Sequence, residues 1–166
     1  MIRCVLGGDP GKTGAIAAVS LEPGNALLGV VDVPIVGKDV SIPLLARAVA
    51  ELTAELDVVA SAVEKVGAMP GQGRQSMYVF GEVTGLMLMV LGASWPLARP
   101  TSPVWKKHFR LPDKKVDRAA ARRAAIQRWP GCADLFARAK DDGRADAALI
   151  ALWCAETQPI ARGVAA

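Results

Sequence analysis

The sequence predicts a layered α/β domain, and three observations lead to that prediction. Two short apolar segments, residues 2–8 and 14–20, flank a Gly/Pro-rich turn, which is typical of a hairpin of buried strands. A short β-branched apolar run at 58–63 indicates a central parallel strand. Apolar residues with helical spacing follow the strands, so strands and helices are combined as they are in α/β folds.

The expected elements form three antiparallel strands followed by two parallel ones, with helices around them, in a single domain spanning 1–166. The five strands are expected at residues 2–8, 14–20, 26–33, 58–63 and 95–98. The helices are expected at residues 42–56 (with Ser41 as N-cap), 75–91, 101–109, about 113–129 and 142–156. Loops are expected at 36–41 and 67–73, the stretch 131–140 is ambiguous, and the tail 157–166 is expected to be frayed.

The composition favours a globular protein, since 52% of the 166 residues are hydrophobic and 22% are charged. No apolar run approaches the roughly 18 residues of a membrane span, and no secretion signal is visible. The three cysteines lack C-x-x-C spacing, which indicates buried thiols in a reducing compartment rather than disulfides or a zinc site. We therefore expect a cytoplasmic protein.

The positive charge is concentrated in one segment, residues 99–128. It contains ten Lys and Arg residues and two acids, whereas the whole chain has a net charge of only +4. A solvated helix face is the simpler explanation of a charged run. Because the rest of the chain is acidic overall, however, the segregation favours a polyanionic partner such as nucleic acid.

Asp9 lies where the first apolar strand ends, in the stretch GGDPGKTGAIAA. An ionised carboxylate at the end of a core strand is costly unless it is paired or binds a metal. The simpler alternative is that Asp9 only caps an Asp-Pro-Gly turn. A phosphate-binding loop is excluded because the first glycine of that motif would fall on Leu6.

Three further acids are placed where they can join Asp9. Glu64 ends the strand at 58–63, and ligand sites in open α/β sheets gather at the carboxyl ends of strands. Asp142 and Asp146 are four residues apart at the start of an apolar helix, so they share one face. Carboxylates without a histidine fit a hard cation, Mg²⁺ or Mn²⁺, and two such ions would support phosphodiester hydrolysis. Solvated surface acids are the alternative.

These motifs together resemble the RuvC-type Holliday junction resolvases, including their compact phage-encoded forms. The residues that carry the resemblance are Asp9-Pro-Gly-Lys-Thr-Gly14, Val63-Glu64 and Arg144-Ala-Asp146-Ala-Ala-Leu-Ile-Ala151. The resemblance implies a ribonuclease H-like fold and a homodimer that resolves DNA four-way junctions by paired, Mg²⁺-dependent nicks, in recombination and repair. It also implies four catalytic, metal-binding acids, of which Asp9, Glu64 and Asp146 carry over directly. The fourth family position falls on Gly143, so Asp142 is assigned to it, with Asp141 as the alternative.

The resemblance also implies a basic DNA-binding surface beside the acids. One of Lys106 and Lys107 is expected near the scissile phosphate, and Lys107 is assigned to that catalytic role. The residues expected to contact DNA are Lys12, Arg74, Lys106, Lys107, Lys114, Lys115, Arg118 and Arg122.

The expected dimer surface is the helix at 75–91, which is apolar almost all round and therefore suited to burial on two sides. Two opposed nicks require two active sites related by twofold symmetry. Gly81 and Gly85 would form a groove for another helix, although a neighbouring helix of the same chain is the alternative occupant. The expected interface consists of Phe80, Gly81, Thr84, Gly85 and Leu88.

Two other classes of function remain open at this point. The actin and sugar-kinase group shares the D-x-G-x-T-G pattern of residues 9–14 and binds nucleotide phosphates with it, but the chain is short for a two-lobed kinase. A non-catalytic DNA-binding module would explain the basic segment but not the aligned acids.

Overall fold

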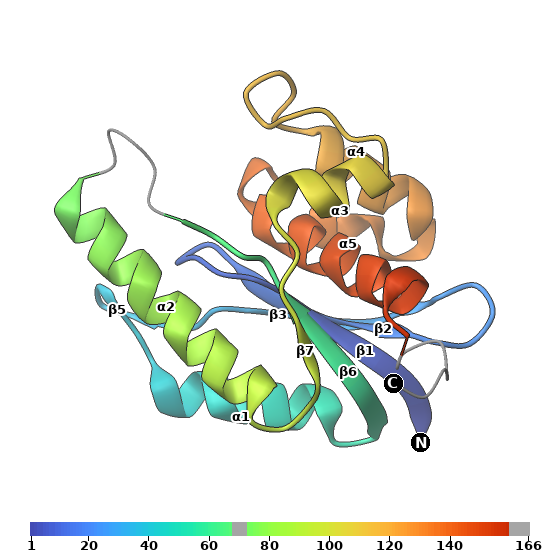
Figure 1. The fold of residues 1–166 in the computed structure, drawn as a ribbon, viewed down its shortest axis with the longest axis horizontal. Coiled ribbons are helices and arrows are strands. Elements are labelled where there is room, and N and C mark those ends of the chain that lie inside the picture. Colours follow the sequence, from blue (N-terminus) through green and yellow to red (C-terminus); the bar gives the residue numbers. More distant parts are fainter. Residues whose placement is uncertain (68–72, 160–166) are drawn as a thin grey trace.

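The main sheet of the protein has five strands in the order β3-β2-β1-β6-β7. It is seen in a computed structural model that describes residues 1–67 and 73–159 (Figure 1). Strands β1, β2 and β3 pair antiparallel, whereas β1, β6 and β7 pair parallel, which confirms the predicted mixed sheet. The strands are β1 (Ile2–Asp9), β2 (Ala15–Ser20), β3 (Leu27–Asp32), β6 (Leu56–Val63) and β7 (Leu97–Ala98).

Helices cover both faces of this sheet and enclose two separate hydrophobic cores (Figure 1). On one face lie α3 (Ser102–His108), α4 (Ala120–Arg128) and α5 (Asp142–Thr157). On the other face lie α1 (Ile42–Thr53) and α2 (Arg74–Gly92). Two short 3₁₀ helices, η1 (Pro130–Phe136) and η2 (Ala139–Asp141), connect α4 to α5.

Helix α5 packs directly on the central strand β1. A Cβ built on Gly7 would lie 2.2 Å from the backbone nitrogen of Ala151 and 2.3 Å from the carbonyl oxygen of Ala147. No side chain fits there, so glycine is required at position 7. Eleven consecutive residues of the helix, Ala145 to Ala155, are buried. The alanine-rich sequence of this helix both favours the helical state and permits the close approach.

The parallel pairing of β1 with β6 brings the first two acids to one edge of the sheet. Gly8 pairs with Val63, and the backbone N–H of Glu64 donates to the carbonyl of Gly8 at 3.1 Å. An isolated bridge between Lys65 and Thr101 extends this edge to the start of α3. Asp9, Glu64 and α3 are therefore neighbours because of the strand register.

Two sequence expectations need correction, and one stretch that the sequence left open can be assigned. The predicted loop 36–41 overlaps a small hairpin, β4 (Ile35–Val36) and β5 (Asp39–Val40). The helix expected from about 113 begins only at Ala120, because residues 113–119 form turns in which Asp113 and Asp117 accept backbone hydrogen bonds two residues ahead. The ambiguous stretch 131–140 contains the 3₁₀ helices. The predicted loop at 67–73 and the tail fall mostly outside the described residues.

Two expectations about the chain as a whole can be compared with the structure. Cys4 and Cys154 are buried, Cys132 is partly exposed, and all three thiols are free. Within residues 1–67 and 73–159, no helix combines the length and the apolar character that crossing a membrane would require.

Candidate active site

Three carboxylates from different elements meet at the carboxyl edge of β1 and β6, and we call them the acid cluster: Asp9, Glu64 and Asp146. Asp9 is the last residue of β1, Glu64 directly follows β6, and Asp146 lies in α5 with 1% of its surface exposed. Burial raises the pKa of Asp9 well above its ordinary value, and the negative charges of Asp146 and Glu64 raise it further. The charge of each acid therefore influences the pKa of its neighbours.

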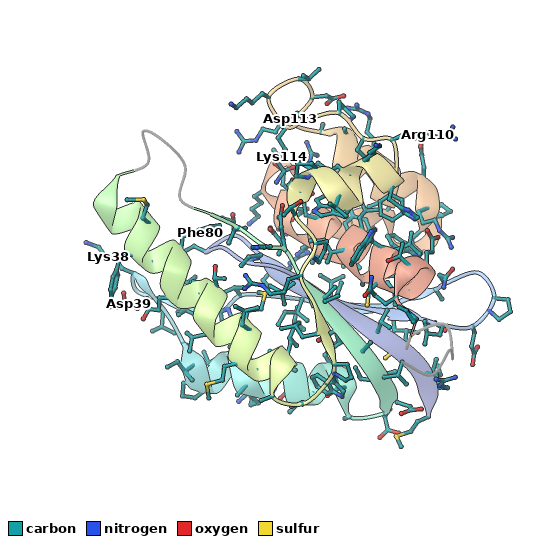
Figure 2. The ribbon with its side chains drawn as sticks, viewed as in Figure 1. Lys38, Asp39, Phe80, Arg110, Asp113 and Lys114 are labelled. Atoms are coloured by element: carbon teal, nitrogen blue, oxygen red, sulfur yellow. The ribbon has the colours of Figure 1, made fainter. Side chains whose placement is uncertain are left out.

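Lys114, which is labelled in Figure 2, lies in the turn at 113–119 and contacts the acid cluster. Its Nζ lies 2.5 Å from Oδ2 of Asp146. The two oxygens of Asp146 are buried but have no partner with hydrogen-bond angles, so the contact is an ion pair. Burial alone would lower the pKa of Lys114, but the charges of Asp146, Asp9 and Glu64 raise it overall. The sequence analysis assigned Lys114 only to DNA contact, because its position in the sequence does not indicate that it contacts Asp146.

Glu64 is held against helix α3. It is 8% exposed, and burial raises the pKa of its carboxyl group. The side chains of Ser102 and Trp105 oppose that rise, which places two polar groups of α3 next to the carboxylate. The indole nitrogen of Trp105 is buried near this carboxylate but does not reach hydrogen-bond geometry with it. Helix α3 therefore forms the wall of the site on the Glu64 side.

The lysine of α3 that faces the acids is Lys106, not Lys107. Lys106 is 8% exposed, its ammonium lies 5.4 Å from the ring centre of Trp105, and its charge lowers the pKa of Asp9 and Asp146. Lys107 is exposed. Consecutive helical residues point about 100° apart, so only one of the two can face the cluster. The geometry favours Lys106 for the role that the sequence assigned to Lys107.

The two candidates for a fourth acid are both engaged elsewhere. Asp142 accepts hydrogen bonds from Nε of Arg122 at 2.7 Å and Nε of Arg118 at 3.3 Å. Both oxygens of Asp141 accept from Arg138, and this pairing lowers the pKa of Asp141. The assignment of a fourth metal ligand to Asp142, or to Asp141, stays a prediction.

Gly143, the family position for the fourth acid, has no room for a side chain. A Cβ built there would lie 2.1 Å from the carbonyl oxygen of Thr13. The first turn of α5 therefore packs on the turn that follows Asp9, and this contact fixes the distance between the two acid-bearing elements.

The donor set of the acid cluster suits a hard divalent cation, because carboxylate oxygens are the ligands that Mg²⁺ and Mn²⁺ prefer. In the part of the chain that the structure describes, no three His, Cys, Asp or Glu side chains are gathered closely enough to enclose a metal ion. Yet Asp146 has two buried oxygens without hydrogen bonds, and the ammonium group of Lys114 balances their negative charge. The site therefore already holds a positive charge next to Asp146, and the residues fit a metal ion as an alternative source of that charge.

The remaining predicted DNA contacts are distributed around this edge. Lys12 lies in the turn after Asp9 and donates to the carbonyl of Lys38. Lys115 is exposed, and Arg118 is 84% exposed at its side chain. The side chain of Arg74, at the start of α2, falls outside the described residues.

The sequence analysis missed two basic residues at the same edge. Arg138 and Lys140 line a hollow of about 200 Å³ together with Lys12, and Lys140 also lines a second hollow with Arg118 and Arg122. Both lie in the stretch 131–140, whose structure the sequence left ambiguous, and outside the basic segment 99–128. Their positive charge suits the predicted DNA surface, but no sequence pattern indicated that they lie next to α4.

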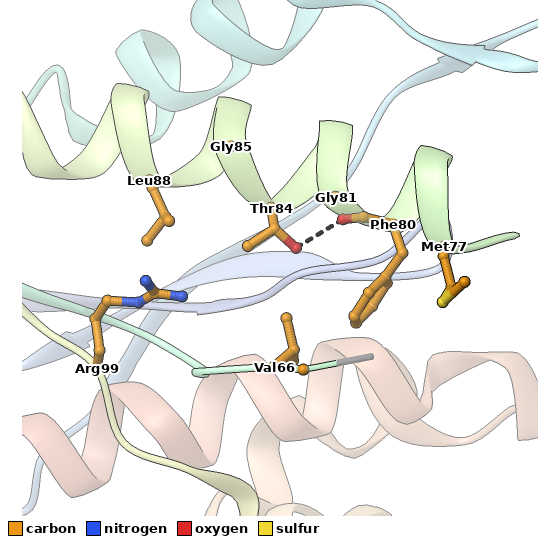
Figure 3. Close-up of a pocket in the computed structure, with 9 residues that line it drawn as sticks. Val66, Met77, Phe80, Gly81, Thr84, Gly85, Leu88 and Arg99 are labelled. Atoms are coloured by element: carbon orange, nitrogen blue, oxygen red, sulfur yellow. Dashed lines mark hydrogen bonds between the residues drawn. The ribbon is translucent and has the colours of Figure 1, made fainter. Parts of the chain in front are cut away.

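The five residues predicted for a dimer interface line one groove on α2, with a volume of about 340 Å³ (Figure 3). Phe80, Thr84 and Leu88 point from the helix into this groove, and Val66 and Arg99 face them from the other side. A Cβ built on Gly81 or Gly85 would meet nothing within 4 Å. No helix in the described part of the chain covers the two glycines, which was the alternative considered for this face.

The sheet order, the helices on both faces and the acids at the strand ends define a ribonuclease H-like α/β fold. No protein-family model matches the chain, and no curated protein matches it. Among solved structures, the chain is similar to T. thermophilus RuvC in complex with a Holliday junction substrate. The TM-score is 0.59 at 21% identity, over 90% of this chain and 90% of that chain. At this identity the likeness shows the fold, which confirms the ribonuclease H-like prediction.

Proposed function

We propose that this chain is a metal-dependent endonuclease that resolves DNA four-way junctions and related branched DNA. The observation that carries the proposal is the acid cluster at the carboxyl ends of β1 and β6, completed by Asp146 of α5 and accompanied by two lysines. The fold likeness to a RuvC bound to a Holliday junction supports the choice of substrate. A kinase-like function is not supported in this way. The lysines that could bind a phosphate, Lys106 and Lys114, lie beside the carboxylates themselves.

In this proposal the acid cluster holds Mg²⁺ or Mn²⁺, with two ions per active site. The bound ions would activate water and stabilise the leaving oxygen in phosphodiester hydrolysis. Asp9, Glu64 and Asp146 provide the negative charge that retains them. Helix α5 fixes Asp146 relative to Asp9 through the contact between Gly143 and Thr13.

Two lysines act on the phosphate in this proposal. Lys106 is held by burial against Trp105, so it meets the scissile phosphate in a fixed position and stabilises the charge that develops on it. Lys114 is paired with Asp146 and is carried by a turn rather than a helix. Occupation of the acid cluster by a divalent cation would release its ammonium toward the same phosphate.

The junction as substrate requires a second copy of the chain. One chain contains one acid cluster, and resolution needs two nicks in opposed strands, so we propose a C2 homodimer. Its interface is the groove on α2, where two glycines lie open and Phe80, Thr84 and Leu88 line an apolar surface. Tyr78 and Met89 of the same helix are 70% and 69% exposed, which extends the apolar face available for burial.

Junction cleavage by the wild type and by Asp9→Asn tests the proposal. The amide lacks the charge that holds a cation, so cleavage should be lost while junction binding is retained or improved. Asp57→Asn is a matched control, because Asp57 is a half-exposed acid near the opposite end of β6. EDTA should abolish the wild-type activity. Wild-type cleavage rates in Asp9→Asn, or ATP hydrolysis without junction cleavage, would contradict the proposal.

A further inference from the structure

A basic hollow lies where the start of α5 meets α4 and the segment before η2. It is lined by Arg118, Ala119, Arg122, Ala139, Lys140 and Asp142 and has a volume of about 390 Å³. Three of these residues are cationic and one is anionic, so the hollow has an excess of positive charge. A phosphate group matches that charge, and guanidinium groups bind phosphate with particular geometric preference.

Asp142 uses both of its oxygens to fix the two arginines of this hollow. Arg122 donates to one oxygen at 2.7 Å and Arg118 to the other at 3.3 Å. The side chains of Asp142 and Arg122 are 16% and 18% exposed, so this pair is held within the protein surface, whereas Arg118 is 84% exposed. A shielded ion pair with an exposed second arginine orients both guanidinium groups along one wall.

The acids next to this hollow are already neutralised. Asp141 is bound by Arg138, and Asp32 accepts two hydrogen bonds from Arg144 at 2.6 and 2.5 Å. Lys140 lines both the basic hollow and the neighbouring hollow that contains Lys12 and Arg138. The two hollows therefore share Lys140, and together their basic side chains reach from α4 to the turn that follows Asp9, an arrangement suited to the backbone of one DNA strand.

We propose that Asp142 is a positioning residue that presents Arg118 and Arg122 to one phosphate of the DNA strand entering the active site, rather than a metal ligand. The inference deepens the proposed function and rests on it. Asp142 directly precedes Gly143, whose contact with Thr13 fixes the first turn of α5. The arginines are therefore held at a constant distance from Asp9 and Asp146.

The first test measures junction affinity against salt concentration, in EDTA so that no cleavage occurs. Arg118→Ala/Arg122→Ala should lower the slope of log K against log[salt] by about 0.9, the loss of one phosphate contact. Arg3→Ala/Arg47→Ala is the matched control, since both arginines are exposed ion-pair partners on other elements, and it should leave the slope unchanged. An unchanged slope in Arg118→Ala/Arg122→Ala overturns this inference alone, whereas failure of the wild type to bind junctions overturns the proposed function as well.

The second test separates positioning from metal binding. In calorimetric titrations with Mn²⁺ and no DNA, Asp142→Asn should bind within about twofold of the wild type, whereas Asp146→Asn should lose affinity about tenfold or more. If Asp142→Asn loses Mn²⁺ affinity as Asp146→Asn does, Asp142 is a ligand and the inference is wrong. Asp142→Ser replaces Asp142→Asn, in this titration and in the double-mutant cycle below, should that variant not fold.

A double-mutant cycle on junction affinity distinguishes positioning of the two arginines from a purely structural role of Asp142. The effect of Asp142→Asn should disappear in the Arg118→Ala/Arg122→Ala background, because the aspartate acts through those two side chains. Independent sites add within about twofold in affinity. Simple additivity of the two changes would therefore contradict the positioning role.

Discussion

Helices α5 and α2 lie on opposite faces of one sheet, and their glycine contacts differ completely. A Cβ on Gly7 would collide with the backbone of α5, whereas a Cβ on Gly81 or Gly85 of α2 would meet nothing within 4 Å. Helix α5 is buried along eleven consecutive residues, but α2 leaves Tyr78 and Met89 largely exposed. Glycine thus permits close packing within the chain on one face, whereas on the other face it leaves the helix surface uncovered.

This difference indicates two separate tasks. The tight face fixes the position of Asp146 relative to Asp9, which the proposed function needs because catalytic groups must be held precisely. The open face exposes apolar surface, which is typical of a site that binds another molecule. Sequence composition alone does not separate the two helices, because both are rich in apolar residues and both lie in or near glycine-containing segments.

The largest effect is expected from Gly7→Ala. Its new methyl group would lie 2.2 Å from the backbone of α5, so the helix or β1 must shift. Because neither backbone can move without opening the core, we expect a loss of about 3 kcal/mol or more in the free energy of unfolding. Urea denaturation followed by circular dichroism measures it. A loss below about 1 kcal/mol would mean that α5 is not tightly seated.

On the open face, Gly85→Leu should leave the monomer folded but prevent dimerisation. The leucine side chain has free space in one chain and would fill the groove that a second copy needs. Under the proposed C2 dimer, light scattering should show a monomer for this variant and a dimer for the wild type, and junction substrates should receive single, unpaired nicks from the variant. A dimer with paired nicks in this variant would move the interface to another surface.

The acid cluster beside α5 should weaken the fold as the pH rises. Burial raises the pKa of Asp9 in the folded state above its ordinary value of 3.8. The folded protein therefore binds this proton more tightly than the unfolded chain does. The corresponding stability is complete below the unfolded pKa and is lost as the pH rises through the folded pKa.

Asp9→Asn should accordingly raise the melting temperature at pH 7 in EDTA, and the gain should shrink as the pH falls toward 4. Thermal unfolding of both proteins across that range measures it, with Asp57→Asn, a change at a half-exposed acid of β6, as the control. A lower melting temperature of Asp9→Asn at neutral pH would mean that Lys114 and Lys106 overcompensate the burial of the carboxylate.

The smallest effect is expected from Gly85→Ala, measured at concentrations where the wild type is monomeric. Alanine in place of glycine within a helix stabilises it by roughly 0.5–1 kcal/mol when the methyl group has room. Because the space above Gly85 is open in one chain, the free energy of unfolding should rise by about that amount. Destabilisation of the monomer would show that another part of the chain covers this face in solution.

The sequence was sufficient for the sheet and for bringing the three acids to one edge of it, because each acid lies at the end of an apolar strand or near the start of an apolar helix. Asp9 and Glu64 end core strands, and Asp146 follows the start of an apolar helix. Strand register then brings these residues together without further information. The same logic failed between residues 113 and 119, where Asp113 and Asp117 close turns instead of starting a helix.

The basic partners of the acids could not be predicted, because their positions depend on turns and on helix packing rather than on a periodic pattern. Lys114 reaches Asp146 from a turn, whose side-chain directions have no period in the sequence. The choice between Lys106 and Lys107 depended on the rotation of a seven-residue helix about its axis. The bonds from Asp142 to Arg118 and Arg122 depended on how α4 packs on α5, which composition does not specify.

The packing of α5 on β1 also sets the order of events during synthesis. The strand that ends in Asp9 is made near the beginning of the described chain, and the helix that carries Asp146 is made near its end. Chains emerge from the ribosome N-terminus first, at about 5–20 residues per second. A nascent chain therefore holds Asp9 and Glu64 without their third partner, so the acid cluster cannot assemble until the last helix has been translated.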